Sequence, residues 1–160
     1  MLTEPLELHC IGGFVLTFFY GLPRTTGDID CYTAVPADLN FDAMAGQGSP
    51  LHQKYKVWLH RVAIANLPED YATRLAEMAP GQFERLRIRV PDPYDCILSK
   101  IERASPKDRE DADYLFRSQS LDSEVLRQRY ENELRHNLIG NVDWHDKTLE
   151  LCIEIFVAPR

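Results

Sequence analysis

The stretch IGGFVLTFFYGLPRTTGDID, residues 11–30, decides the fold, because a short apolar segment joins two glycines to two aspartates. The preceding residues, 6–12, are apolar with some alternation, which predicts a strand that ends at the glycines. The run after Gly13 predicts a buried helix that ends near Pro23, since proline stops a helix. Residues 28–35 then predict a second strand, and this order of elements indicates an α/β fold.

The two aspartates of this stretch, Asp28 and Asp30, are two residues apart on the predicted strand. Their side chains therefore point to one face, with the Cα atoms roughly 6–7 Å apart. Like charges so placed repel each other unless a cation lies between them. Mg²⁺ (or Mn²⁺) accepts a few carboxylates and completes its shell with water and phosphates. The pair indicates a metal site, and a solvated strand face after a turn accounts for the same residues.

The glycine pair, Gly12 and Gly13, lies where the first strand meets the helix. Backbone N–H groups can bind phosphate oxygens there, because no Cβ blocks their approach. A tight turn without any ligand is the alternative. If the helix returns the chain so that the two strands are neighbours, the glycine turn and the aspartates face one cleft. Arg24, Thr25 and Thr26 would then lie near a bound triphosphate, or else form the loop surface and shape the turn.

The rest of the chain divides at Pro91. Before it the patterns predict, in order, a helix at 37–46, a loop at 46–50, a strand at 57–68, a helix at 68–80 and a strand at 83–91. After it they predict four helices, at 92–104, 106–119, 121–136 and 144–158. We therefore expect a single domain over 1–160 of the α/β (α+β) class. A small mixed sheet of about four strands, backed by helices, occupies 1–91, and a helical C-terminal part occupies 92–160.

A second group of charged residues falls on the first two of these four helices. Lys100 lies beside the apolar stripe of its predicted helix, and Asp108 and Asp111 border the apolar stripe of the next. Charges turned inward on neighbouring helices pair with each other or line a wet cavity. The three residues therefore predict either a structural ion pair or a catalytic group. In the catalytic interpretation Lys100 stabilises phosphate charge, and one aspartate activates an acceptor or binds metal.

Two stretches resemble a known superfamily. GGFVLTFFYGLPRTTGDIDCY is similar to the opening motif of the polymerase-beta-like nucleotidyltransferases, which is a glycine pair, a short helix and an Asp-x-Asp strand. Its "G..RTT.DID" form resembles minimal bacterial members related to the abortive-infection (AbiEii-type) toxins. VPDPYDCILSKIERASPKDREDADYL is similar to the second pattern of those proteins. The whole chain, over about residues 6–155, most resembles an uncharacterised bacterial nucleotidyltransferase-like family.

The resemblance implies a nucleotidyltransferase-like fold and an activity. Mg²⁺ at Asp28 and Asp30 would bind an NTP, and a nucleotidyl group would pass to an acceptor with release of pyrophosphate. Lys100 and either Asp108 or Asp111 would take part. In the toxin relatives the acceptor is often tRNA and the partner is a neighbouring antitoxin protein.

One departure from the superfamily weakens the expectation of catalysis. Polymerase-like members carry a third carboxylate on a later strand, whereas the strand RLRIRV carries arginines at 85, 87 and 89. That row is either a solvated strand face or a substrate groove. A binding or regulatory module without turnover is the alternative function, and a scaffold without a nucleotide site is a third.

Composition limits the partners. The net charge of −7 and the pI near 5.2 argue against a surface built broadly for phosphate backbones. A protein is therefore an acceptor class to consider in addition to RNA. No apolar run is long enough for a membrane span and the start is not a signal peptide, so we expect a cytoplasmic protein. The cysteines lie in apolar runs and are expected to be buried, and the histidines at 52, 60, 136 and 145 lack the paired spacing of metal ligands.

Overall fold

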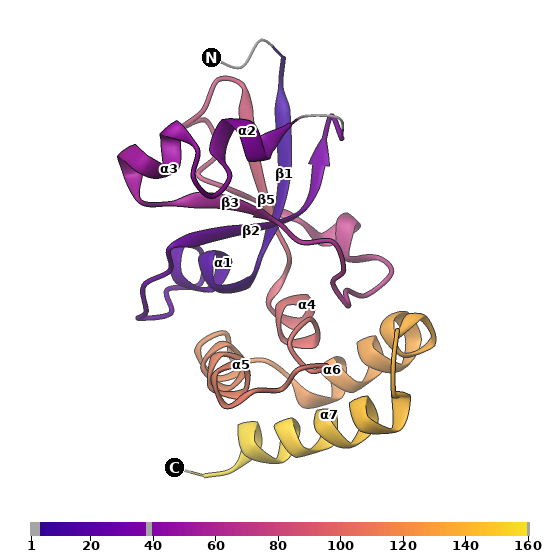
Figure 1. Cartoon of the computed structure of the whole chain (residues 1–160). Helices are drawn as coiled ribbons and strands as arrows, with labels where there is room; N and C mark the ends of the chain where they lie inside the picture. Colours follow the sequence, from indigo (N-terminus) through magenta and orange to yellow (C-terminus); the bar gives the residue numbers. More distant parts are fainter. Residues whose placement is uncertain (1–3, 38–39, 160) are drawn as a thin grey trace. The chain divides into compact units, whose positions relative to one another are not determined.

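The computed structural model describes residues 4–37 and 40–159. The chain divides into two compact units. The first consists of the described residues of Met1–Ala65 and Leu75–Pro91, and the second of those of Asn66–Arg74 and Asp92–Arg160. All strands belong to the first unit, and Figure 1 shows the course of the chain through each unit.

The first unit is built on a five-stranded mixed sheet in the order β3-β2-β1-β5-β4. Its strands are β1 (Leu6–Ile11), β2 (Asp28–Val35), β3 (Trp58–Arg61), β4 (Ala76–Met78) and β5 (Leu86–Val90). β1 runs antiparallel to β2 and parallel to β5, while β2 runs parallel to β3, and β4 antiparallel to β5. The predicted class, a small mixed sheet with helices, is confirmed, with one strand more than the expected four.

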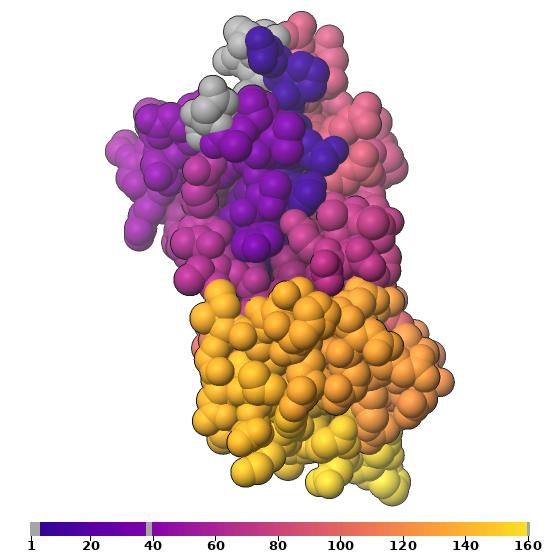
Figure 2. All heavy atoms as spheres, turned by 90° about the vertical axis from the view of Figure 1, so that its right-hand side faces the viewer, coloured from indigo at the N-terminus to yellow at the C-terminus, as the bar shows by residue number. Residues whose placement is uncertain are grey.

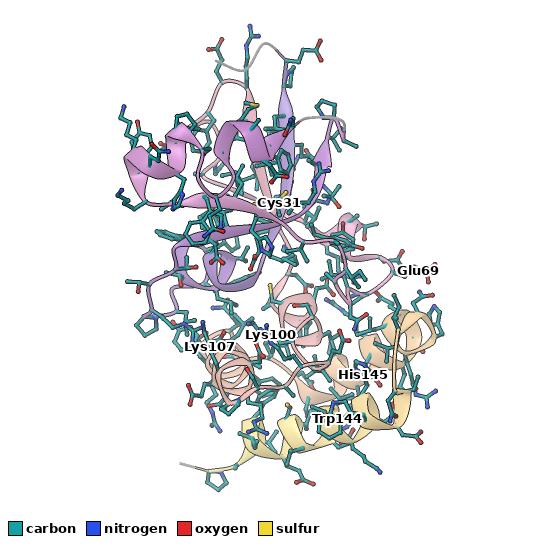
Figure 3. All side chains as sticks on the ribbon, in the orientation of Figure 1. Cys31, Glu69, Lys100, Lys107, Trp144 and His145 are labelled. Atoms are coloured by element: carbon teal, nitrogen blue, oxygen red, sulfur yellow. The ribbon has the colours of Figure 1, made fainter. Side chains whose placement is uncertain are left out.

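Apolar side chains of β1 and β2 form the core of this unit. Leu8, Cys10 and Cys31 are almost fully buried, and Figure 3 shows Cys31 in the sheet. Helix α1 (Gly12–Phe18) adds buried Val15 and Leu16. Helices α2 (Phe41–Ala45) and α3 (Pro50–Tyr55) lie side by side, and α2 contacts β3. The sheet therefore has helices packed on it, as the alternation of elements predicts.

The predicted loop at 46–50 is confirmed as far as Ser49, whereas the predicted helix at 68–80, whose residues belong partly to each unit, is wrong. The expected loop at 46–50 ends in a helix start, because Pro50 begins α3 and the side chain of Ser49 accepts the N–H of His52 as its N-cap. The expected helix at 68–80 is a 3₁₀ turn, η1 (Tyr71–Arg74), followed by β4. β4 pairs with β5, and this pairing overrides the helical spacing of its apolar residues.

The second unit is helical, as expected for the C-terminal part. It contains α4 (Pro93–Leu98), α5 (Pro106–Ser118), α6 (Ser123–Arg129), a π-helix η2 (Tyr130–Leu134), a 3₁₀ turn η3 (Arg135–Asn137) and α7 (Val142–Val157). Phe116 of α5 stacks on Phe156 of α7, with ring centroids 5.0 Å apart. In Figure 2 the residues of α6 to α7, orange to yellow, form one continuous surface of this unit.

A buried ion cluster ties residues 66–74 to the helices of the second unit. The carboxylate of Asp95 on α4 is fully buried and accepts hydrogen bonds from Arg74 and Arg129, at 3.0–3.1 Å. Arg74 also donates to Glu133 at 2.7 Å. Burial raises the pKa of the Asp95 carboxyl, and the guanidinium of Arg74 opposes that effect. The cluster explains why a segment that lies between two strands in sequence belongs to the helical unit.

Candidate functional site

The two predicted metal ligands meet a third side chain at one edge of the sheet. β2 begins at Asp28 and pairs in parallel with β3, so that Asp30 is the register partner of His60. The imidazole Nδ1 of His60 lies 2.8 Å from Oδ1 of Asp30. One donor atom each from Asp28, Asp30 and His60 can be chosen so that all lie within 4.8 Å of one another. We refer to these three residues as the acidic–imidazole cluster.

Gly12 packs directly against this cluster. Its neighbour Ile11 is the register partner of Asp30, so the turn into α1 passes over the carboxylate of Asp30. Gly12 has φ +72°, a conformation that residues with a Cβ rarely adopt, and a Cβ at this position would overlap Oδ2 of Asp30. The glycine is therefore required twice, for its backbone angle and for the space that it leaves to the carboxylate.

Thr26 joins Gly13 to the first aspartate. Its hydroxyl donates to Oδ1 of Asp28 at 3.0 Å and lies 3.2 Å from the carbonyl oxygen of the same residue. A Cβ on Gly13 would lie 3.5 Å from the Thr26 hydroxyl. The residues predicted from the opening motif are thus neighbours in space, namely Gly12, Gly13, Thr26, Asp28 and Asp30.

Arg24 and Thr25, which together with Lys100 are also predicted to bind nucleotide, precede this group. The backbone N–H of Arg24 donates to the carbonyl of Leu22, the Arg24 residue is half-buried, and Thr25 is exposed. Their role in nucleotide binding stays a prediction.

The donor atoms of the cluster suit a divalent cation. The two carboxylates match the oxygen ligands of Mg²⁺ and Mn²⁺, and the imidazole adds a nitrogen donor of the kind that first-row transition metals accept. The cluster is partly open to solvent, since the His60 side chain is 59% exposed and that of Asp30 is 27% exposed. An ion here would keep positions open for water or phosphate oxygens.

The second predicted group, Lys100 with Asp108 and Asp111, forms within the helical unit. The predicted helix 92–104 ends early at Leu98, so that Lys100 lies in the turn that follows α4 (Figure 3). Its ammonium group donates to Oδ2 of Asp111 at 3.0 Å and to Oδ1 of Asp108 at 3.3 Å. These contacts match the ion pair expected from the sequence. A role of the three residues in catalysis stays a prediction.

The two aspartates of this group differ in their surroundings. Asp108 forms a capping box with Ser105 at the start of α5 and accepts two hydrogen bonds of 2.7 Å from Arg103. Burial opposes ionisation, but the bonds from Arg103 and Ser105 and the charge of Lys100 hold the pKa of Asp108 well below its usual range. Asp108 therefore has a structural role at the start of the helix, whatever else it does.

His60 is the residue that the sequence analysis missed. The search for a third carboxylate considered the strand at 83–91, but β5 pairs with β1 and β4, not with β2. Its Arg89 forms ion pairs with Glu7 at 3.1 Å and with Glu77 at 3.5 Å. The neighbour of β2 is β3, and it places His60 beside Asp30. Parallel pairing of the two strands was the missing information, since spacing among histidines says nothing about an aspartate thirty residues away.

Within the described residues, no helix combines the length and the apolar character needed to cross a membrane.

Comparison with protein families matches residues 2–152 of the chain to the family described as nucleotidyltransferase of unknown function (DUF6036). No curated protein and no solved structure matches the chain. The match spans nearly the whole chain and includes every residue of the acidic–imidazole cluster and the glycine turn. The chain therefore belongs to this nucleotidyltransferase family.

Proposed function

We propose that the protein transfers a nucleotidyl group from an NTP to an acceptor hydroxyl, with a divalent cation, Mg²⁺ or Mn²⁺, at Asp28 and Asp30. The observation that carries this proposal is the convergence of two carboxylates on a glycine turn in a chain of a nucleotidyltransferase family. When bound, such an ion activates the acceptor hydroxyl and stabilises the departing pyrophosphate.

The residues of the first unit have separate tasks in this proposal. Thr26 fixes the carboxylate of Asp28 through its 3.0 Å hydrogen bond, and Gly12 and His60 confine the carboxylate of Asp30. The α1 helix begins at Gly12 and Gly13 with no hydrogen bond from a capping side chain and no acidic residue in its first turn. The N–H groups of this turn are the proposed contacts of the triphosphate, and Arg24 and Thr25 extend that surface.

The remaining predicted residues belong to the acceptor side of the proposal. Lys100 would stabilise phosphate charge. Either Asp108 or Asp111 would act as the base, and Lys100 donates to both carboxylates. RNA, such as tRNA, and a protein hydroxyl are the two acceptor classes, and the net charge of −7 favours the protein. An activity as the toxin of a toxin–antitoxin pair, with an antitoxin protein as partner, is part of the same proposal, and cytoplasmic location would suit it.

A non-catalytic binding module is the second candidate function. The observation in its favour is that the strand paired with β2 brings an imidazole, His60, beside Asp30 and not a third carboxylate. In that case the nucleotide would bind without being turned over.

Calorimetric titration with each NTP, with and without Mg²⁺ or Mn²⁺, followed by an assay of pyrophosphate release, tests both functions. We expect metal-dependent NTP binding by the wild-type protein, lost in Asp28→Asn and kept in Asp42→Asn. The control changes the same type of residue at an exposed position on α2. Pyrophosphate release supports the transferase, and binding without release in the presence of cell extract supports the module. NTP binding that does not depend on metal would contradict both.

A further inference from the structure

We propose that His60 is a ligand of the metal ion and that it directs the site toward Mn²⁺ and similar transition-metal ions over Mg²⁺ when no nucleotide is bound. This inference deepens the proposed function and rests on it, because it concerns the ion that Asp28 and Asp30 would hold. It adds a residue outside the opening motif and gives the site a metal preference.

The geometry of the two parallel strands brings the imidazole to the carboxylates. Asp30 and His60 are register partners on β2 and β3, and Nδ1 of His60 lies 2.8 Å from Oδ1 of Asp30. Metal–ligand bonds of about 2.1 Å at right angles place two neighbouring donor atoms about 3 Å apart. The observed separation is therefore close to one edge of a coordination shell. The three donor atoms all lie within 4.8 Å of one another. They therefore need to move only slightly closer together to surround an ion.

The position of His60 allows that contraction without disturbing the core. Its side chain is 59% exposed, at the rim of the sheet, so its ring can rotate with little loss of packing. The strand partner of Asp28 is Trp58, whose ring contacts His52 with the centroids 4.9 Å apart. Trp58 offers no metal ligand, which leaves His60 as the donor that β3 contributes.

The chemistry of imidazole predicts the metal preference. Mg²⁺ prefers oxygen ligands and holds its water firmly, whereas imidazole nitrogen suits first-row transition metals. With two carboxylates and a neutral imidazole, an ion of charge +2 is balanced by Asp28 and Asp30. His60 then contributes affinity without adding charge. This contribution is larger for Mn²⁺ than for Mg²⁺ and larger again for Co²⁺, which lies further along the first-row series.

The competing account gives His60 a hydrogen bond to Asp30 and nothing more. A half-exposed pair of this kind contributes little to stability. In that account the imidazole competes with the ion for the carboxylate. Removal of the ring would then leave metal affinity unchanged or raise it, which is opposite to the effect of removing a ligand.

Metal binding to the nucleotide-free protein separates the two accounts. Free Mn²⁺ is measured by electron paramagnetic resonance, alone and in competition with Mg²⁺, for the wild type, His60→Ala and His60→Asp. His136→Ala is the matched control, since His136 is half-exposed and pairs with Glu69 in the other unit. We expect His60→Ala to weaken Mn²⁺ binding by at least about tenfold, the lower end of the loss seen when even an outer partner of a ligand is removed.

The experiment also measures the change in Mg²⁺ affinity and in metal preference, and the visible absorption of bound Co²⁺. Mg²⁺ binding should change less than about threefold in His60→Ala, and His60→Asp should shift the preference toward Mg²⁺. Co²⁺ bound to the wild type should show a visible absorption that changes in both His60 variants and not in His136→Ala. Mn²⁺ affinity that is unchanged or higher in His60→Ala, or no Mn²⁺ binding by the wild type, overturns the inference.

Failure of the inference and failure of the proposed function remain distinguishable. Nucleotidyl transfer that depends on Asp28, together with Mn²⁺ affinity that does not depend on His60, would contradict the inference about His60 and support the proposed function. Mn²⁺ binding that depends on His60, without any nucleotidyl transfer, would support the metal-ligand role of His60 and contradict the proposed function. Circular dichroism and thermal melting of each variant show whether it is folded.

Discussion

Replacement of Gly12 by alanine tests the packing of the glycine turn on the metal site. Gly12 has φ +72°, and an added Cβ would overlap Oδ2 of Asp30. Gly81 offers a matched control in the same unit, because it has nearly the same angle, φ +76°, and nothing within 4 Å of an added Cβ. The two substitutions therefore share a backbone cost and differ in the collision with the carboxylate.

The two costs can be separated in magnitude. A left-handed backbone conformation costs a residue with a Cβ roughly 1–2 kcal/mol, and this term applies to Gly12→Ala and Gly81→Ala alike. Moving the Asp30 side chain by about 30° away from the added methyl group costs a further 0.5–1.5 kcal/mol or so. We expect Gly12→Ala to lose about 2–3 kcal/mol of the free energy of unfolding. A difference of about 1 kcal/mol from the control corresponds to about 2–4 °C in melting temperature.

Metal binding shows the functional part of the effect. Displacement of the Asp30 carboxylate should weaken Mn²⁺ binding by about 10–100-fold in Gly12→Ala. Gly81→Ala should bind Mn²⁺ as the wild type does, at a temperature where both variants are folded. Equal loss of stability in the two variants with equal Mn²⁺ affinity would refute the argument that Gly12 makes room for a metal-binding carboxylate.

Three further predictions concern stability and reactivity. The pKa of Asp108 is lower in the folded protein than its unfolded value near 3.9, so its contribution to stability is complete above about pH 4 and is lost as the pH falls toward the folded value. The urea midpoint, measured between pH 5 and 2.5, should therefore fall less steeply with pH in Asp108→Asn than in the wild type. Parallel slopes for the two proteins would contradict this prediction. Burial raises the pKa of the Cys31 thiol to about 11 and all four cysteines are buried, so Ellman's reagent at pH 8 should react only after denaturant is added. Rapid reaction of the native protein would contradict the burial of the thiols. Arg74→Met should lower the free energy of unfolding by about 2 kcal/mol, as measured by thermal melting. This is less than the roughly 3–5 kcal/mol of a fully broken buried pair, because Arg129 still pairs with Asp95. An unchanged melting temperature would show that Arg74 contributes nothing to stability through this cluster.

The sequence contained enough information to predict the first strand, the glycine turn and the strand of the two aspartates. These elements follow from local signals, such as the alternation of 6–12 and the proline at 23, and from the motif that combines them. The helix that begins at Pro106 was likewise predicted from a local signal, since proline suits the first helical turn.

What the sequence did not predict depends on pairing between distant residues. Ala76–Met78 has helical spacing of its apolar neighbours, yet it forms β4 because β5 offers it a partner. His60 looks isolated among the histidines, yet it joins the site because β3 pairs with β2 in a register that sets it beside Asp30. The helix that begins at Pro50 is a different case, since Ser49 and Pro50 are an ordinary start signal that a glycine-rich neighbourhood obscured.

Transfer of label from each α-labelled NTP in cell extract tests the central claim most directly. The wild-type protein is compared with the Asp28→Asn/Asp30→Asn double variant, in the presence of Mg²⁺ and then of Mn²⁺. The account predicts label on RNA or on a polypeptide with the wild type alone, and the labelled species names the acceptor class. Equal labelling by the double variant would contradict the assignment of catalysis to these two carboxylates.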